Sequence, residues 1–249
     1  MFEPEMKRFY DTQGYLVAKS VFQLSEMAGI QKRVEEIIAD PCQAPRGVSV
    51  SREGDTIKDK SSAEAQNMSV RAMAFLVRFD PLFAAFAVHP GLLELVRGLI
   101  GPKIMIFRDQ MLLKPPGGQA KPLHQDQSYF QVQPENDLVT AWIAMDDATK
   151  DNGCMAYVPT SHKYGIFDIE QDPDRPVHHV PKTGNLNLPA AVACPVSAGS
   201  VIFHHGLTLH HSADNRTESW RKALILHFAT TQARSRRQQL NEEISLVID

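Results

Sequence analysis

The chain has 249 residues and a formal net charge of −3, with 43% hydrophobic and 22% charged residues. This is the composition of a globular protein that is long enough to bury its core without disulfides or metal ions as supports. The small negative charge argues against a sequence-independent nucleic-acid binder, which needs clustered Lys and Arg. A membrane protein is not expected either, because the sequence has no run of about 18 apolar residues.

Residues 1–100 are predicted to be mostly helical. A short helix over 3–14 is followed by a strand over 15–22. Ser25 is expected to cap a second helix, which Pro41 ends. Apolar residues of that helix recur at the spacing that places them on one face: Met27, Ile30, Val34, Ile37 and Ile38. The next stretch, residues 43–67, is polar and nearly free of aromatics. A loop of this length is either a functional lid or a disordered segment, and the sequence leaves both readings open.

From Lys103 onward the pattern changes to short segments rich in β-branched and aromatic residues, separated by Gly, Pro and Asn turn signals. The predicted strands cover 103–114, 137–148, 154–161, 200–205 and 222–231. Many short strands after a helical opening favour a jelly-roll or barrel core, over about residues 101–232, backed by helices. Residues 234–247 are expected to form a closing C-terminal helix, and all of these parts are expected to make one domain over 1–249.

The sequence also suggests a compartment. The three cysteines, Cys42, Cys154 and Cys194, are far apart and show neither zinc-type spacing nor a disulfide framework. The N-terminal segment MFEPEMKRFY has early acidic residues and no apolar stretch, so a secretory signal is not expected. A reducing, cytoplasmic setting is the simplest interpretation.

Residues 122–130, which read PLHQDQSYF, suggest half of a metal site. His124 and Asp126 are two positions apart, and in a strand such residues point to the same face. A set of two histidines and one carboxylate with open positions would suit non-haem Fe(II) oxygenase chemistry. Spacing alone does not choose the second histidine among the five between 204 and 227: His204, His205, His210, His211 and His227.

Arg221 begins the apolar segment 221–229, RKALILHFA. An arginine at the start of a strand is more often a surface residue. If its side chain turned inward, it would need an anionic partner, and a small dicarboxylate would serve.

Three segments of the chain resemble the phytanoyl-CoA dioxygenase family of Fe(II)/2-oxoglutarate oxygenases. They are 114–130 (KPPGGQAKPLHQDQSYF), 141–162 (AWIAMDDATKDNGCMAYVPTSH) and 205–229 (HGLTLHHSADNRTESWRKALILHFA). Family members show His-x-Asp, a tryptophan-bearing strand, an Asn-Gly-Cys turn, and then a histidine followed by Ser-x-x-Asn and an arginine, in this order. The resemblance implies an α+β fold with a mainly β core, a double-stranded β-helix (jelly roll, cupin-like) backed by N-terminal and flanking helices.

The same resemblance implies roles for individual residues. His124, Asp126 and His210 would be the catalytic metal ligands. Arg221, which follows His210 by eleven positions as in the family, would bind the C5 carboxylate of 2-oxoglutarate. Ser212, Gln110 and Trp142 would contact that cosubstrate, and Arg71 loosely matches a basic residue used by some members. The family's frequent Pro-Gly-Ser-His turn appears here with Thr160 in place of glycine, which lacks the conformational freedom of glycine at positive φ.

The implied function is a 2-oxoglutarate-dependent non-haem iron dioxygenase acting on a small molecule. It would use Fe(II), 2-oxoglutarate and O₂, oxidise an unactivated C–H bond and release succinate and CO₂. Because halogenating relatives lack the carboxylate ligand, Asp126 favours a hydroxylase-type reaction. Acyl-CoA is not expected as the substrate, because the basic residues that could bind its phosphates are scattered. Two alternatives use the same residues: a non-catalytic sensor of metal and 2-oxoglutarate, and a zinc-type hydrolase, in which Arg221 has no evident role.

Overall fold

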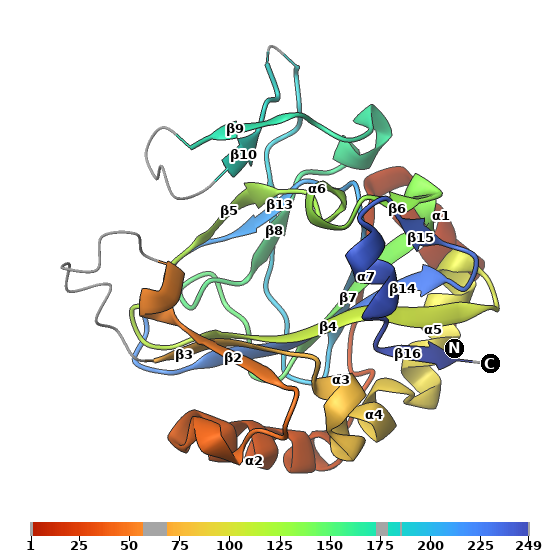
Figure 1. The fold of residues 1–249 in the computed structure, drawn as a ribbon. Coiled ribbons are helices and arrows are strands. Elements are labelled where there is room, and N and C mark those ends of the chain that lie inside the picture. The colour runs from red at the N-terminus through yellow and green to blue at the C-terminus, as the bar shows by residue number, and fades with distance from the viewer. Residues whose placement is uncertain (1, 57–68, 173–178, 185, 249) are drawn as a thin grey trace.

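Residues 2–56, 69–172, 179–184 and 186–248 are described by the computed structural model, which is a mixed α+β fold with antiparallel sheets (Figure 1). The main sheet has eight strands in the order β1-β12-β7-β14-β4-β3-β2, with β16 also paired to β4. Their bounds are β1 Tyr15–Ala18, β12 Val201–His205, β7 Leu138–Ala144, β14 Arg221–Thr230, β4 Ile104–Lys114, β3 Val70–Ala74, β2 Ser49–Arg52 and β16 Leu246–Ile248.

A second sheet of four strands, in the order β11-β8-β13-β5, faces the main sheet (Figure 1). Its strands are β11 Val192–Cys194, β8 Met155–Tyr157, β13 His210–Ser212 and β5 Lys121–His124. Two further antiparallel pairs are β9 Ile169–Gln171 with β10 His179–Pro181, and β6 Val132–Gln133 with β15 Arg234–Ser235. Neighbouring strands in the described parts of both sheets are antiparallel.

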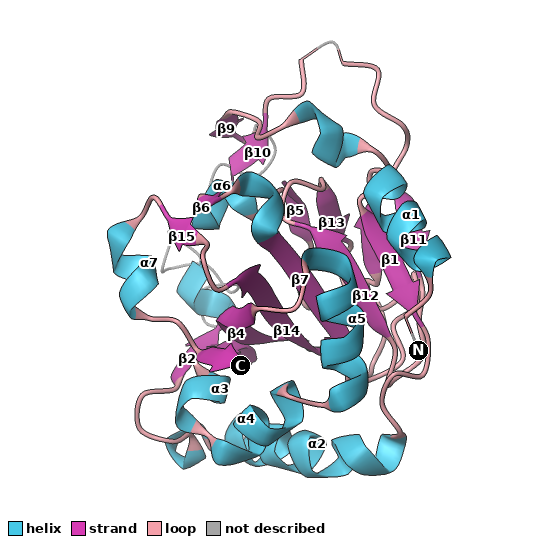
Figure 2. Cartoon of the chain, turned by 90° about the vertical axis from the view of Figure 1, so that its right-hand side faces the viewer, coloured by secondary structure: helices cyan, strands magenta, loops and turns pink. Residues whose placement is uncertain are grey.

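Helices cover the side of the main sheet that faces away from the second sheet (Figure 2). The α-helices are α1 Pro4–Gln13, α2 Leu24–Ala39, α3 Leu76–Phe79, α4 Pro81–Ala87, α5 Pro90–Ile100, α6 Gln127–Phe130 and α7 Gln238–Glu242. The 3₁₀ turns are η1 Pro41–Gln43, η2 Glu53–Thr56, η4 Glu135–Asp137 and η5 Ser161–Tyr164. No single helix in the described ranges is long and apolar enough to span a membrane, although the bent pair α4–α5 meets the length and composition test together. The buried residues of that pair pack in the main core.

Side-chain alternation divides β14 between two environments. Leu224, Leu226 and Phe228 belong to the core under the helices, whereas Ala223 and Ile225 belong to the cluster between the sheets. The same alternation operates on β7 and β12, because successive strand residues point to opposite faces. Each central strand therefore supports the helical core with one face and lines the space between the sheets with the other.

Several predictions about the first hundred residues are confirmed, with two corrections: the strand predicted over 15–22 ends at Ala18, and the second helix has a different cap. The first helix ends at Gly14, whose φ of +84° is the left-handed conformation that glycine tolerates. The predicted Ser25 cap is wrong. The cap is Gln23, whose backbone N–H donates to Glu26 Oε2 at 2.7 Å while its own side chain accepts from the third helical residue. This reciprocal capping box satisfies two of the helix's unpaired donors, so the helix begins one residue before Ser25.

The predicted C-terminal helix over 234–247 is wrong along most of its length. Only α7 is helical there, and the chain on either side of it forms β15 and β16. Asn241 bonds both the backbone N–H and the carbonyl of Ser235, at 2.8 and 2.9 Å, which turns the chain back on itself. The strand β16 then pairs with β4 at Ile104–Ile106, a stretch that β3 does not cover. An available sheet edge and a side-chain turn outweigh helical propensity here.

Two loop predictions have mixed outcomes. Within the polar stretch 43–67, residues 49–52 form β2, which pairs with β3, while residues 57–68 lie outside the described residues. Its function as a lid stays a prediction, as does the single domain over 1–249. Thr160 has a φ of +64°, so the turn keeps the left-handed conformation although glycine is absent.

Candidate metal centre and its pocket

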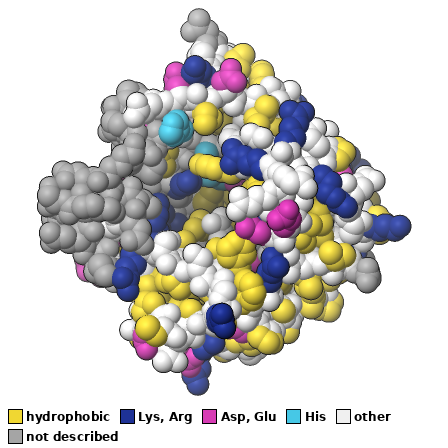
Figure 3. All heavy atoms as spheres, in the orientation of Figure 1, with side chains coloured by type: hydrophobic (Ala, Val, Ile, Leu, Met, Phe, Trp, Pro, Cys, Tyr) yellow, Lys and Arg dark blue, Asp and Glu magenta, His cyan; other side chains and the backbone are white. Residues whose placement is uncertain are grey.

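A cavity of about 380 Å³ lies between the two sheets. Its walls come from the second sheet on one side and from β4, β7, β12 and β14 on the other. Figure 3 shows a hollow on this face of the molecule, with Lys and Arg side chains around it. All seven residues that the family resemblance implies as ligands or cosubstrate contacts line this cavity: Gln110, His124, Asp126, Trp142, His210, Ser212 and Arg221.

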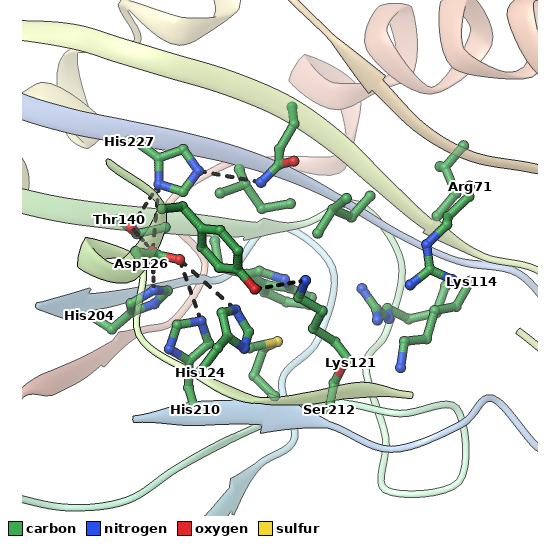
Figure 4. A pocket seen from close by; sticks show the side chains of 18 of the residues that line it. Arg71, Lys114, Lys121, His124, Asp126, Thr140, His204, His210, Ser212 and His227 are labelled. Atoms are coloured by element: carbon green, nitrogen blue, oxygen red, sulfur yellow. Dashed lines mark hydrogen bonds and ion pairs between the residues drawn. The ribbon is translucent and has the colours of Figure 1, made fainter. Parts of the chain in front are cut away.

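His124, Asp126 and His210 meet at one end of the cavity (Figure 4). His124 Nε2 and His210 Nε2 lie 4.0 and 3.7 Å from Asp126 Oδ1, and one ligand atom from each residue falls within 4.8 Å of the others. The two histidines are paired across the β5–β13 ladder, which places their ring centroids 4.1 Å apart. Three nitrogen and oxygen atoms that converge in this way can hold a divalent metal ion.

Asp126 reaches this site by a different route from the predicted one. The strand β5 ends at His124, and Asp126 has the right-handed helical conformation at the start of α6. Strand alternation therefore does not align the two ligands. The turn from β5 into α6 brings the carboxylate back toward the histidines.

Backbone carbonyls orient both histidines. His124 Nδ1 lies 2.7 Å from the Pro122 carbonyl oxygen, and His210 Nδ1 lies 2.9 Å from that of Thr208. Each Nδ1–H donates to its carbonyl, so each Nε2 keeps a lone pair directed toward the metal position. Burial, together with the charge of Lys121, lowers the pKa of His124 to about 3, and burial lowers the pKa of His210 well below its usual range. Both rings are therefore neutral at neutral pH, as metal ligands must be.

Hydrogen bonds hold the Asp126 carboxylate so that one oxygen is left for the metal. Asp126 Oδ2 accepts from Thr140 Oγ1 at 2.5 Å and from His204 Nε2 at 2.9 Å, whereas Oδ1 faces the two ligand histidines. Burial alone would raise the pKa of Asp126. The hydrogen bond from His204 and the surrounding imidazoles instead hold it well below its usual range, so the carboxylate is ionised.

A second layer of hydrogen bonds stands behind Thr140 and His204. His227 Nδ1 lies 2.9 Å from Thr140 Oγ1, and its Nε2 lies 3.4 Å from Gln110 Nε2. On the other side, the Tyr157 hydroxyl lies 3.2 Å from His204 Nδ1. Burial lowers the pKa of His227 to about 4, so the ring is neutral. With a neutral His227 ring, the donors on that side run from Gln110 to His227 to Thr140, and Asp126 Oδ2 is the final acceptor.

The sequence pattern identifies these supporting residues only in part. His227, one of the five histidines that spacing leaves open as a ligand, is 2% exposed and bonded to Thr140. Thr140 was not identified, although it lies two positions before Trp142 and so shares its face of β7. His204, another of these five histidines, contacts the ligand carboxylate instead of the metal position. Alternation along β7 and β12 is the sequence signal for both.

Arg221 lies at the other end of the cavity. Its side chain is 2% exposed, so the common surface location of a strand-starting arginine does not apply here. It occupies the same face of β14 as Ile225 and His227, and its Cζ lies 5.4 Å from the centroid of the Trp142 ring. Burial lowers the pKa of Arg221 to about 10, which still leaves it charged.

The hydrogen-bond donors at the Arg221 end of the cavity suit a carboxylate ligand. Among the described residues, Arg221 Nε and Nη1 and Trp142 Nε1 have no hydrogen-bond partner, although all three atoms are buried. An unsatisfied buried donor costs about 1–3 kcal/mol, and more when it is charged. A ligand carboxylate across the cavity from the metal position would satisfy the guanidinium bidentately. The cavity thus offers a metal position at one end and an anion position at the other, the arrangement that a chelating dicarboxylate such as 2-oxoglutarate requires.

Two more cations, Lys114 and Arg71, lie close together in the cavity wall (Figure 4). Lys114, whose Cα is paired with that of Arg221, is 6% exposed and donates to the Ala213 carbonyl. Burial and the charges of Arg221 and Arg71 lower the pKa of Lys114 to about 7. Arg71 lies 2.5 Å from Glu53 Oε2, so an internal carboxylate already neutralises it. Lys114 was not predicted, although it shares the face of Gln110 and Leu112 on β4.

Comparison with known proteins identifies the family of the chain. The family model for phytanoyl-CoA dioxygenase (PhyH) matches residues 10–223. The "Probable phytanoyl-CoA dioxygenase" of Caenorhabditis elegans is 29% identical over 240 residues, covering 90% of this chain and 74% of the relative. The human "Phytanoyl-CoA dioxygenase, peroxisomal" is 29% identical over 242 residues, covering 91% and 68% of the two chains.

Solved structures with the same fold include enzymes of varied chemistry. The non-haem α-ketoglutarate-dependent carbocyclase SnoK from nogalamycin biosynthesis has a TM-score of 0.72 and 25% identity, covering 94% of this chain and 87% of its own. EctD from S. alaskensis with 2-oxoglutarate and 5-hydroxyectoine has a TM-score of 0.72 and 22% identity, covering 92% and 76%. α-Ketoglutarate is another name for 2-oxoglutarate, and both structures are named with it.

Proposed function

The chain belongs to the phytanoyl-CoA dioxygenase family of Fe(II)- and 2-oxoglutarate-dependent oxygenases, and from this membership we propose that it hydroxylates an unactivated C–H bond of a small, free molecule. The observation that carries the proposal is the pairing of two features in one cavity. His124, Asp126 and His210 converge at one end, and the buried Arg221 guanidinium has unpartnered donors at the other.

The residues of the cavity would have distinct roles in binding the metal and the cosubstrate. His124, Asp126 and His210 would hold the iron, with Thr140 and His204 fixing the carboxylate. Arg221 would bind the far carboxylate of 2-oxoglutarate, with Ser212 and Trp142 beside it in the cavity wall. When bound, iron and 2-oxoglutarate supply the oxidising power, with O₂ consumed and succinate and CO₂ released.

The cavity wall also controls water. Leu112, Phe130, Met155 and Ile225 contribute apolar side chains to the cavity wall. An apolar wall limits solvent around the reacting centre and strengthens the charged contacts within it. The protein's part is thus to position two small molecules and to keep water away from them.

Three observations support the finer parts of the proposal. Asp126 keeps the carboxylate ligand that a hydroxylase-type oxygenase uses, whereas halogenation needs that position vacant. A cavity of about 380 Å³ that also receives 2-oxoglutarate suits a small free molecule better than an acyl-CoA thioester. The zinc-hydrolase alternative gives no use for the unpartnered Arg221 guanidinium. We also propose that the two facing sheets form a double-stranded β-helix. We further propose that the enzyme is cytoplasmic, which is consistent with its free cysteines.

Anaerobic titration with Fe(II) and 2-oxoglutarate tests the assignment. The wild type should develop a weak visible metal-to-ligand charge-transfer band, and air should then yield succinate. Arg221→Gln should need far more 2-oxoglutarate to form the band, because it loses a charged bidentate contact. Arg216→Gln is the matched control, since Arg216 is exposed, lies outside the cavity and donates its backbone N–H to the Asp151 carbonyl. Bound iron without a band in the wild type would refute the cosubstrate assignment.

A further inference from the structure

Lys121 is a cation of the cavity that the metal and cosubstrate positions do not use. It begins β5, is half-buried and lines the cavity. Its Nζ lies 3.3 Å from the Tyr129 hydroxyl and 5.1 Å from the centroid of that ring. Among the described residues it has no carboxylate partner within ion-pair distance. Figure 4 shows its amine pointing into the cavity, between the His124–Asp126 end and the Arg71–Lys114 end.

Tyr129 connects this lysine to the metal end. Its ring meets the His124 ring edge to face, with centroids 5.8 Å apart. Tyr129 is also 42% exposed, although it lies in the cavity wall. The Lys121–Tyr129 pair therefore stands between the metal ligands and the solvent, where a molecule entering the cavity would meet it.

The charges of the loaded cavity leave Lys121 uncompensated. Iron(II) and Arg221 together carry three positive charges, and Asp126 with the dianion 2-oxoglutarate carries three negative ones. Arg71 is neutralised by Glu53, at 2.5 Å. Lys114, at the far end beside Arg221, has its pKa lowered to about 7 and already donates to the Ala213 carbonyl. The full positive charge that remains beside the metal is that of Lys121, and a cavity with surplus charge favours an oppositely charged ligand.

We propose that Lys121 and Tyr129 form the recognition site for the carboxylate of the substrate, which is a small organic acid with an apolar body. This inference rests on the proposed function and adds the substrate class to it. The Lys121 amine donates to the carboxylate, and the Tyr129 hydroxyl, which accepts from Lys121, directs its own proton to the same anion. The apolar body lies against Leu112, Met155 and Ile225. Anchoring the acid beside His124 orients its neighbouring carbons toward the metal.

Matched pairs of probes test this site without knowledge of the natural substrate. The probes are hexanoate with hexanamide and 3-phenylpropionate with 3-phenylpropionamide, titrated calorimetrically into the anaerobic enzyme loaded with Fe(II) and 2-oxoglutarate. The acid of each pair should bind about tenfold or more tightly than its amide, the factor expected for a charge-assisted hydrogen bond. Lys121→Gln should erase this preference, Lys121→Arg should retain it, and Lys121→Glu should reverse it in favour of hexylamine. Lys163→Gln, which removes an exposed lysine outside the cavity, should leave it intact.

The outcomes separate this inference from the proposed function. If the wild type forms no charge-transfer band, the proposed function itself fails. If the band forms but acids and amides bind equally, if no acid binds, or if the preference survives in Lys121→Gln, the inference is overturned. A weaker 2-oxoglutarate affinity in Lys121→Gln, read from the band, would assign the lysine to the cosubstrate and would also overturn it.

Discussion

Replacing Thr140 with valine should weaken iron binding about ten- to a hundredfold. Thr140 is 1% exposed, and its hydroxyl lies 2.5 Å from Asp126 Oδ2 and 2.9 Å from His227 Nδ1. Valine has nearly the same shape, so the substitution removes one donor from the ligand carboxylate and leaves the packing in place. A hydrogen bond to a charged group contributes about 1.5–3 kcal/mol. At about 1.4 kcal/mol for each factor of ten, this corresponds to a factor of about ten to a hundred, the range seen when partners of metal ligands are removed.

The loss should appear in metal affinity, because the free carboxylate can then rotate away from the position that aims Oδ1 at the metal. Anaerobic competition between the enzyme and a chromophoric chelator for Fe(II) measures it. Thr230→Val is the matched control: Thr230 also donates to a carboxylate at 2.5 Å, that of Asp137, but outside the cavity. Wild-type iron affinity in Thr140→Val, or an equal loss in Thr230→Val, would refute the assignment of Thr140 as the residue that orients Asp126.

Three other predictions follow from single contacts. His204→Phe should also lower Fe(II) affinity in the chelator assay, because Asp126 Oδ2 loses its second donor, at 2.9 Å; an affinity equal to that of the wild type would contradict this. The affinity for 2-oxoglutarate, read from the charge-transfer band, should fall as pH rises through about 7, because Lys114 is charged below that pKa and neutral above it. Lys114→Met should flatten this pH profile. A flat profile in the wild type would contradict the prediction. Gly14→Ala should lower the melting temperature by more than Gly101→Ala does. Both glycines have positive φ, but of the two only Gly14 would bring a Cβ against other atoms, His162 Nδ1 at 2.4 Å and Thr208 Oγ1 at 2.5 Å. Equal losses would show that backbone strain alone matters.

The sequence predicts those features of the site that depend on local order. The residues alone predict His124 and Asp126 and leave five histidines open, whereas the family resemblance implies His210 and Arg221. The structure brings all four to one cavity. The strand pairings that hold these residues together are harder to predict from the sequence. The pairing of β5 with β13 joins residues more than eighty positions apart, and no local propensity specifies it.

The two wrong secondary-structure predictions also result from long-range or side-chain contacts that the local sequence does not reveal. Ser25 is a good capping residue, but the reciprocal bonds of Gln23 and Glu26 decide where the helix starts. Residues 234–247 have helical propensity, but an open edge of β4 accepts part of them as β16. In each case a contact that is absent from the local sequence pattern contributes more than the pattern does.

The strand β14 shows why the metal and cosubstrate positions are linked. Arg221, Ile225 and His227 stand at odd positions, so one face of the strand carries the anion-binding group, a cavity wall and the support of Thr140. The even positions, such as Leu224 and Leu226, fill the helical core. A deletion of one residue between 222 and 226 would turn either the Arg221 end or the His227 end toward the helices, because the side-chain period is two. The register that buries the core is therefore the same register that holds the anion position at a fixed place relative to the metal ligands.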